Sequence, residues 1–243
     1  MTHKLSYVLD RAVNKVCQYI YAAPQDSDVS FIAMFHNVLR DNEAVALEYE
    51  CYESELICFI NMMSAQGVKF VSLDELLTLP KEEAEKKKCV ITFDDGYASV
   101  FTLAAPILHE RKIPFTVYVT TSFLNTKDYL SSDQLKKLSQ MPYCTIGMHS
   151  HDHVMFRFKT NKELIADYNK CRAIISEITG NFPIHYAFPY GSVYACSYRN
   201  CRVVRGLGAK SVAMTMQIRL RRSVLGHHFY LPRLDIPSWY RKY

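Results

Sequence analysis

The chain of 243 residues is 49% hydrophobic and 22% charged, an ordinary balance for a globular protein that is long enough to form one large α/β domain. No apolar run approaches the roughly 18 residues that a membrane span needs, so a transmembrane protein is not expected. The net charge is +5 at pH 7 without any nucleic-acid-binding motif, so nucleic acid is not an expected partner.

Residues 1–28 are predicted to form a lead segment before the main domain, which takes in residues 29–243. Apolar residues recur at helical spacing within the segment and predict a helix at about 4–22. The segment lacks the continuous apolar run of a signal peptide, so we expect a cytoplasmic protein. The eight cysteines of the chain form no CxxC pair, which indicates reduced thiols and agrees with that location.

Strands and helices are predicted to alternate along the main domain. Strands are expected at 29–35, 68–71, 89–93, 115–120, 145–148, 186–188 and 211–215. Helices are expected at about 50–66, 73–79, 98–111, 132–140, 161–179 and 195–207. This alternation predicts an α/β fold in which helical crossovers join parallel strands.

Polar residues follow the ends of four of these strands. They are His36, the pair Asp94 and Asp95, His149, and the segment that begins Pro189–Tyr190. In barrel-like α/β folds the carboxyl ends of the strands form the edge where catalytic groups gather. The two aspartates could instead cap the helix that follows them. The histidines at the same edge favour a functional role.

His149 and His153 lie four residues apart, a spacing that brings two imidazoles to one side of a helical turn. Two imidazoles and one carboxylate leave a metal ion with open positions for water and substrate, which is the pattern of a catalytic site. Together with the acidic pair, this predicts a metal site. His151, which lies between the two histidines, is expected to be a solvent-facing spectator, with metal ligation as the alternative.

These motifs resemble those of the polysaccharide deacetylases, also called NodB-homology or carbohydrate esterase family 4 enzymes. The similar segments are TFDDG (92–96), HSHDH (149–153), the YHxV-like FHNV (35–38), the segment 67–76, FPYG (188–191) and LPR (231–233). The resemblance covers about residues 29–236. It implies a NodB-like fold, a single distorted (β/α) barrel of about seven parallel strands. It also implies a metal-dependent hydrolase that removes an N-acetyl group from a polysaccharide or a saccharide precursor.

The chemistry and the resemblance together imply roles for the residues of the site. Asp95, His149 and His153 would bind one divalent metal ion, Zn²⁺ in the first place, with Co²⁺ or Ni²⁺ as alternatives. The metal would activate a water molecule and polarise the acetyl carbonyl. Asp94 would be the general base, and the backbone N–H of Tyr190 would stabilise the oxyanion.

The leaving amine needs a proton, and three histidines compete for the role of general acid. His36 is preferred, because it ends a strand at the correct edge and matches the YHxV-like segment of the family. His227 and His228 are the alternatives. His185 is expected to be structural.

Two departures from the family pattern concern the surroundings of the site. The Arg that orients the catalytic Asp in classical members is absent before the third motif, so the group that orients Asp94 is open, with Arg233 as a candidate. No Asp-x-x-Asp-Trp motif is present to form a wall of the sugar site. Pro189, Arg233 and His228 are predicted to contact the substrate.

Residues 178–234 contain no Asp or Glu but several Arg and Lys. This stretch is either a solvated basic face or a surface for a phosphate-bearing substrate or an acidic membrane surface. The alternatives to N-deacetylation are hydrolysis of a formyl group or of a non-sugar amide, and a catalytically silent carbohydrate-binding domain.

Overall fold

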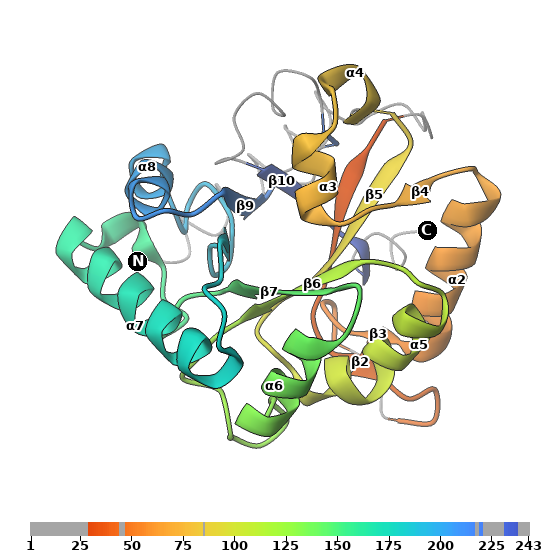
Figure 1. Ribbon diagram of the computed structural model, residues 1–243, viewed down its shortest axis with the longest axis horizontal. Coiled ribbons are helices and arrows are strands. Elements are labelled where there is room, and N and C mark those ends of the chain that lie inside the picture. Colours follow the sequence, from red (N-terminus) through yellow and green to blue (C-terminus); the bar gives the residue numbers. More distant parts are fainter. Residues whose placement is uncertain (1–28, 44–46, 85, 217–218, 221–230, 238–243) are drawn as a thin grey trace.

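The computed structural model describes residues 29–43, 47–84, 86–216, 219–220 and 231–237. Within these ranges parallel strands form a closed barrel, and helices surround it (Figure 1). No helix in the described ranges is both long and apolar enough to cross a bilayer. The helix expected at about 4–22 lies outside the described residues, so the domain boundary at residue 28 stays a prediction.

Seven strands make up the ring. They are β1 (Phe31–Phe35), β5 (Lys88–Phe93), β6 (Phe115–Val119), β7 (Cys144–Met148), β8 (His185–Ala187), β9 (Ser211–Thr215) and β10 (Leu231–Asp235). Their order is β1, β10, β9, β8, β7, β6, β5, and β5 pairs back onto β1 to close the ring. Every neighbouring pair is parallel. The predicted single barrel of about seven parallel strands is confirmed.

The barrel is distorted at β5. An eighth strand, β4 (Lys69–Phe70), pairs with the first residues of β5, whereas β6 pairs with its last residues. A separate small parallel sheet joins β2 (Val38–Leu39) to β3 (Cys51–Tyr52). The sequence did not predict β10, because Pro232 and Arg233 are poor residues for a central strand.

The helices are α2 (Glu53–Ala65), α3 (Leu73–Thr78), α4 (Lys81–Ala84), α5 (Ala105–Glu110), α6 (Ser132–Gln140), α7 (Asn161–Thr179) and α8 (Tyr198–Gly206), with a 3₁₀ turn η2 (Phe156–Phe158). Ser72, Ser131, Thr160 and Ser197 cap four of them, each accepting a hydrogen bond from the backbone N–H three residues on. Gly180 ends α7 with a φ of 75°.

The helix expected at 98–111 is interrupted. Its first part is a π-helical segment, η1 (Val100–Ala104), which leads into α5. Pro106 lies in the first turn of α5 and has no backbone N–H to donate to the preceding turn. A wider π turn accommodates that missing hydrogen bond, which explains the difference from a regular helix.

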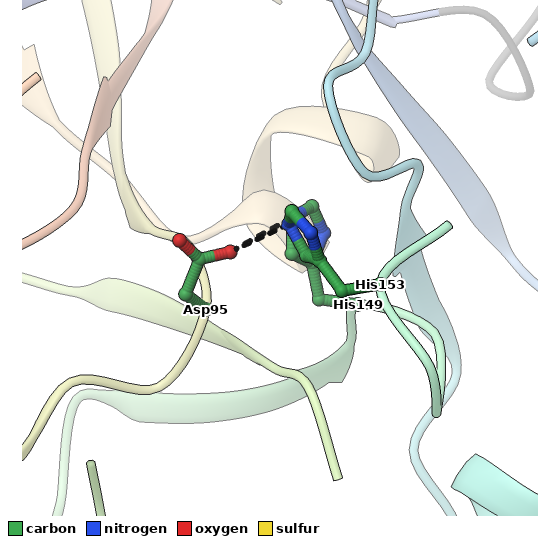
Figure 2. Close-up of side chains that lie close together, drawn as sticks. All are labelled: Asp95, His149 and His153. Carbon is green, nitrogen blue, oxygen red and sulfur yellow. Dashed lines mark ion pairs between the residues drawn. The ribbon is translucent and has the colours of Figure 1, made fainter. Parts of the chain in front are cut away.

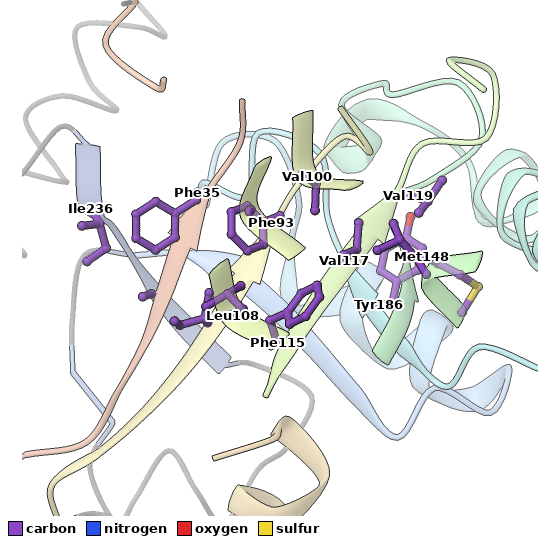
Figure 3. Close-up of a cluster of buried hydrophobic side chains, with 14 of the residues drawn as sticks. Phe35, Phe93, Val100, Leu108, Phe115, Val117, Val119, Met148, Tyr186 and Ile236 are labelled. Carbon is purple, nitrogen blue, oxygen red and sulfur yellow. The ribbon is translucent and has the colours of Figure 1, made fainter. Parts of the chain in front are cut away.

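Successive residues of the ring strands point to opposite sides, one set outward toward the helices and the other inward into the barrel. Phe35, Phe93 and Phe115 belong to the larger apolar cluster, with stacked or edge-to-face rings 5.6 and 6.2 Å apart (Figure 3). Ile32 and Val90, which lie at intervening positions, belong to a second cluster. Each buried aromatic or aliphatic side chain contributes about 1.5–3 kcal/mol. The strand ends therefore project from a rigid, closely packed support.

Candidate metal-dependent active site

Four strand ends bring the predicted site residues to one edge of the barrel. His36 follows β1, Asp94 and Asp95 follow β5, His149 follows β7, and Tyr190 comes shortly after β8. Because all strands of the ring are parallel, these residues share the carboxyl edge. The expectation from the sequence is met by the topology.

Asp95, His149 and His153 form a compact group at this edge. The ligand atoms that they offer all lie within 4.8 Å of one another. Asp95 Oδ1 lies 3.0 Å from His153 Nε2 and 3.4 Å from His149 Nε2, and Figure 2 shows both rings directed toward the carboxylate. The structure thus assembles the three predicted ligands from two different loops.

The donor set of this group fits a divalent metal ion. His149 Nδ1 lies 2.9 Å from the carbonyl oxygen of Ala187 and donates to it, because a carbonyl can only accept. Nε2 is then the atom that faces Asp95 and is free to coordinate. Asp95 Oδ1 is buried and makes no hydrogen bond within the described part of the chain. A buried carboxylate oxygen that two imidazoles face is a suitable set of ligands for a cation.

The electrostatics of the group point the same way. Burial would raise the pKa of Asp95, but its contacts with His149 and His153 hold that pKa well below its usual range. Burial would lower the pKa of His149, but the negative charges of Asp94 and Asp95 raise it. The site therefore concentrates negative charge that a proton or a metal ion must balance, and metal binding would release that proton.

The loop that carries the two histidines is not the helical turn expected from their spacing. Ser150 and His153 have φ angles of 71° and 52°, which turn the chain in the left-handed sense and rule out a helix. That expectation was wrong. The imidazole centroids of His149 and His153 still lie 5.2 Å apart, because the loop folds back on itself.

Asp94 forms an ion pair with Arg233, which lies on β10. Arg233 Nη1 donates to Asp94 Oδ1 and Nη2 donates to Oδ2, each at 2.6 Å. Both side chains are almost entirely buried. Arg233 also contacts Thr92 Oγ1 at 3.3 Å, and its guanidinium carbon lies 5.3 Å from the centre of the Tyr118 ring. The guanidinium therefore has a fixed position inside the barrel.

This ion pair identifies the group that orients Asp94. Burial would raise the pKa of Asp94, but the charges of Arg233 and His149 hold it below its usual range, so the carboxylate is ionised. Arg233 has no exposed surface. The direct contact with substrate that was also predicted for Arg233 therefore does not fit its position.

His36 lies beside the acidic pair. Burial raises the pKa of Asp94 and of Asp95. The positive charge of a protonated His36 helps to lower both values, but contributes less than the ion pairs and hydrogen bonds given above. Its ring lies 5.7 Å from that of Tyr49, and Nδ1 is buried without a hydrogen bond in the described ranges. The other candidates for the general acid, His227 and His228, lie outside the described residues, as does the predicted substrate contact of His228.

The turn after β8 borders the group on another side. Tyr190 has a φ of 61°, and its half-exposed ring lies 4.9 Å from that of His153. Gly191 is packed so closely that an added Cβ would lie 2.3 Å from Thr215 Oγ1. Pro189 is buried, so its side chain offers little surface for the predicted substrate contact.

An aromatic cluster that was not predicted from the sequence borders the metal group on the side of His153. Phe123 and Tyr129, from the loop after β6, have ring centroids 4.6 Å apart, and Tyr97 stacks on Tyr129 at 4.7 Å. Phe123 also lies 5.5 Å from His153. The signal in the sequence was the presence of aromatic residues in the segments that follow two predicted strands.

Two other histidines have separate partners. The His151 ring bonds to Thr121 Oγ1 through Nδ1 at 2.8 Å, so it lies outside the metal group but is not solvent-facing as expected. His185 is fully buried between Ser211 Oγ, at 2.7 Å, and Asp74 Oδ2, at 3.3 Å. Such a place between two side chains fits the structural role predicted for it.

The family model described as "Polysaccharide deacetylase" matches residues 81–212, more than half of the chain. The chain belongs to the polysaccharide deacetylase family. The matched region contains Asp94, Asp95, His149 and His153, whereas His36 and Arg233 lie outside it.

Relatives of this polysaccharide deacetylase include the poly-beta-1,6-N-acetyl-D-glucosamine N-deacetylase of Staphylococcus aureus (strain MSSA476). It is 26% identical over 157 residues, which are 59% of this chain and 54% of the relative. The chain thus spans about half the length of the curated relatives it matches.

Two solved structures share the fold. IcaB from Ammonifex degensii matches with a TM-score of 0.74 at 22% identity, over 87% of this chain and 97% of IcaB. The deacetylase PplD of Streptococcus pyogenes, solved in complex with acetate, matches with a TM-score of 0.72 at 18% identity, over 85% of this chain and 91% of PplD.

Proposed function

We propose that this polysaccharide deacetylase family member is a metal-dependent hydrolase that removes the acetyl group from an N-acetylated saccharide. The observation that carries the proposal is the pairing of an ionised carboxylate, Asp94, with an adjacent group of metal ligands. Adjacent acids then have different tasks, since Asp95 faces the imidazoles and Asp94 faces a guanidinium.

The metal ion is proposed to be divalent, with Zn²⁺ as the first candidate and Co²⁺ or Ni²⁺ as alternatives. Asp95, His149 and His153 would hold it, because two imidazole nitrogens and one carboxylate suit these ions. When bound, such an ion supplies a Lewis acid that makes water more acidic and polarises an acetyl carbonyl.

Asp94 is proposed as the general base. Arg233 occupies one side of the carboxylate through both oxygens, while Oδ2 also lies 3.7 Å from His149 Nε2 and so faces the site. In this position Asp94 would take a proton from the water that attacks the acetyl carbon. The backbone N–H of Tyr190 would stabilise the oxyanion that forms.

His36 is proposed as the general acid. Breaking the C–N bond releases an amine, which leaves readily only if it receives a proton. His36 lies at the same edge of the barrel, with a buried and unpaired Nδ1 in the described ranges. It would donate its proton to the amine nitrogen as the C–N bond breaks, so that the neutral amine leaves and acetate remains.

The substrate is proposed to be a saccharide that carries N-acetyl groups. The name of the Staphylococcus aureus relative makes β-1,6-linked N-acetylglucosamine oligomers the first candidates. The half-exposed Tyr49 and Tyr190 offer ring faces on which pyranose rings can pack. Arg199 and Arg202, which belong to the acid-free stretch 178–234, are exposed and would suit a phosphate-bearing saccharide precursor.

A panel of substrates tests the proposal. Metal-loaded protein is incubated with N-acetylated oligosaccharides, N-formylated oligosaccharides and non-sugar acetamides, and the acids released are identified. Acetate from the N-acetylated oligosaccharides alone is the expected result. Formate, or acetate from the non-sugar amides, would favour the alternative hydrolases. No acid from any substrate, with metal bound, would favour a silent carbohydrate-binding domain.

A further inference from the structure

Asp167 lies on α7 but reaches the loop that carries two of the three predicted metal ligands. It is 8% exposed, and its carboxylate accepts hydrogen bonds from three consecutive residues. The backbone N–H of His151 donates to both oxygens at 3.0 Å, and the N–H of Asp152 donates to Oδ2 at 2.9 Å. Ser150 Oγ donates to Oδ2 at 3.1 Å.

Ser150 extends this network to the second imidazole. Its hydroxyl donates to Asp167 and accepts a hydrogen bond from the backbone N–H of His153 at 3.0 Å. The end of β6 holds the opposite side of the loop, because the N–H of Thr121 donates to the Ser150 carbonyl at 3.3 Å. One buried carboxylate is therefore the shared acceptor for the inner side of the loop.

The loop needs such an acceptor because its backbone is strained. Ser150 and His153 both have positive φ angles, and neither is a glycine. A left-handed conformation costs a residue with a side chain roughly 1–2 kcal/mol and persists only where the surroundings enforce it. The hydrogen bonds to Asp167 supply that constraint at the three residues between the imidazoles.

We propose that Asp167 is a positioning residue, which fixes the backbone of residues 149–153 so that both imidazoles face Asp95 before a metal ion binds. Its carboxylate contacts the loop and would touch neither a metal ion nor a substrate. The part of the inference that concerns metal affinity rests on the proposed function, whereas the part that concerns the loop stands on the hydrogen bonds alone.

Metal affinity is the first test. Asp167→Ala and Asp167→Asn are compared with the wild type by competition for Zn²⁺ with a chromophoric chelator. We expect both to bind Zn²⁺ about 10- to 100-fold more weakly, the usual effect of losing a residue that orients metal ligands. Asn is not a rescue, because its NH₂ group would face N–H donors. Glu177→Ala, at an exposed position on the same helix, is the matched control and should bind like the wild type.

Amide hydrogen exchange in the metal-free protein is the second test, and it does not depend on metal binding. The amides of His151 and Asp152 should exchange faster in either Asp167 variant than in the wild type or Glu177→Ala. If the Asp167 variants do not fold, Ser150→Ala takes their place. It removes the hydroxyl that links Asp167 to the His153 N–H but keeps the bonds from the His151 and Asp152 N–H groups to Asp167, so it should weaken Zn²⁺ binding by a smaller factor. A folded variant with unchanged exchange and unchanged affinity would overturn the proposal. A wild type that binds no Zn²⁺ would count against the proposed function, while the exchange rates would still decide the role of Asp167.

Discussion

Arg233 and Asp94 form a bidentate ion pair inside the barrel, although 138 residues separate them in the chain. The pair joins β10 to the end of β5 and directs the carboxylate toward the metal group. Planar two-point contact of this kind fixes both distance and orientation, which a single charge would not do. The proposed mechanism depends on this contact.

Replacing Arg233 should therefore change the pH dependence of the reaction. In Arg233→Met the charge that lowers the pKa of Asp94 is lost, burial dominates, and that pKa rises. Since a general base works only when ionised, the acidic limb of kcat/KM against pH should move to higher pH. The buried carboxylate without its partner should also cost about 3–5 kcal/mol of stability.

Arg233→Lys is the matched variant for this prediction. It keeps the positive charge but loses the two-point geometry, so it should shift the acidic limb less than Arg233→Met while still reducing kcat. An acidic limb that stays in place in a folded Arg233→Met protein would show that Asp94 is not the titrating base.

Removing the metal ion should stop the reaction and leave the barrel folded. The ligands Asp95 and His153 lie beyond the strand ends, whereas the larger apolar cluster lies between the strands and the helices. Far-ultraviolet circular dichroism after chelation should therefore change little, while acetate release falls to background. His153→Ala should behave in the same way. His151→Ala should retain metal, because that ring bonds to Thr121 instead. Unfolding on chelation would indicate a structural metal.

His36 should matter most when the leaving group needs a proton. His36→Ala should lose most of the deacetylation of an N-acetylated oligosaccharide, yet keep much of the hydrolysis of an aryl acetate, whose leaving group departs without protonation. The exposed His109→Ala is the control and should change neither activity. Equal losses on both substrates would argue that His36 acts in another way.

The pair formed by Asp74 and buried His185 should contribute a pH-dependent part of the stability. Contacts with His185 and Lys210 lower the pKa of Asp74. A carboxyl group whose pKa is lower in the folded state stabilises the fold fully at pH values above its unfolded pKa of about 4. This stabilisation is lost progressively as the pH falls from there toward the folded-state pKa. Asp74→Asn should lower the free energy of unfolding at pH 7 by less than about 1 kcal/mol, because the side chain is 43% exposed and screened. Urea titrations at pH 7 and pH 3 should show a difference that shrinks at the lower pH.

Gly191 should tolerate no side chain. Its φ is 54°, and an added Cβ would approach the backbone nitrogen of Thr215 to 2.6 Å. Gly191→Ala should shift the Tyr190 turn, lowering both the melting temperature and kcat. Gly206→Ala is the control, because no atom lies within 4 Å of its added Cβ. A Gly191→Ala protein as stable and as active as the wild type would contradict the close packing.

Local sequence pattern was enough to predict most of the barrel. Apolar runs such as 89–93 and 115–120 are buried strands, and Ser131 and Gly180 bound helices through short-range capping. The site edge followed from the same pattern, since polar residues directly after parallel strands must lie together. These features depend on contacts between near neighbours in the chain.

The features that could not be predicted from the sequence depend on contacts between residues far apart in the chain. Nothing near Arg233 indicates that β10 is a central strand, because its burial makes sense only with Asp94 as a partner. The conformation of the loop after His149 is likewise set by Asp167, which lies on a different element. The spacing of the two histidines therefore predicted their proximity but not the backbone that brings it about.

Asp94 is proposed to be the base of a metal-dependent N-deacetylation. The most direct measurement combines metal content and acetate release for the wild type and Asp94→Asn, using β-1,6-linked N-acetylglucosamine oligomers. We expect one equivalent of metal in both proteins and acetate release from the wild type alone. Acetate release by metal-loaded Asp94→Asn at the wild-type rate would contradict it.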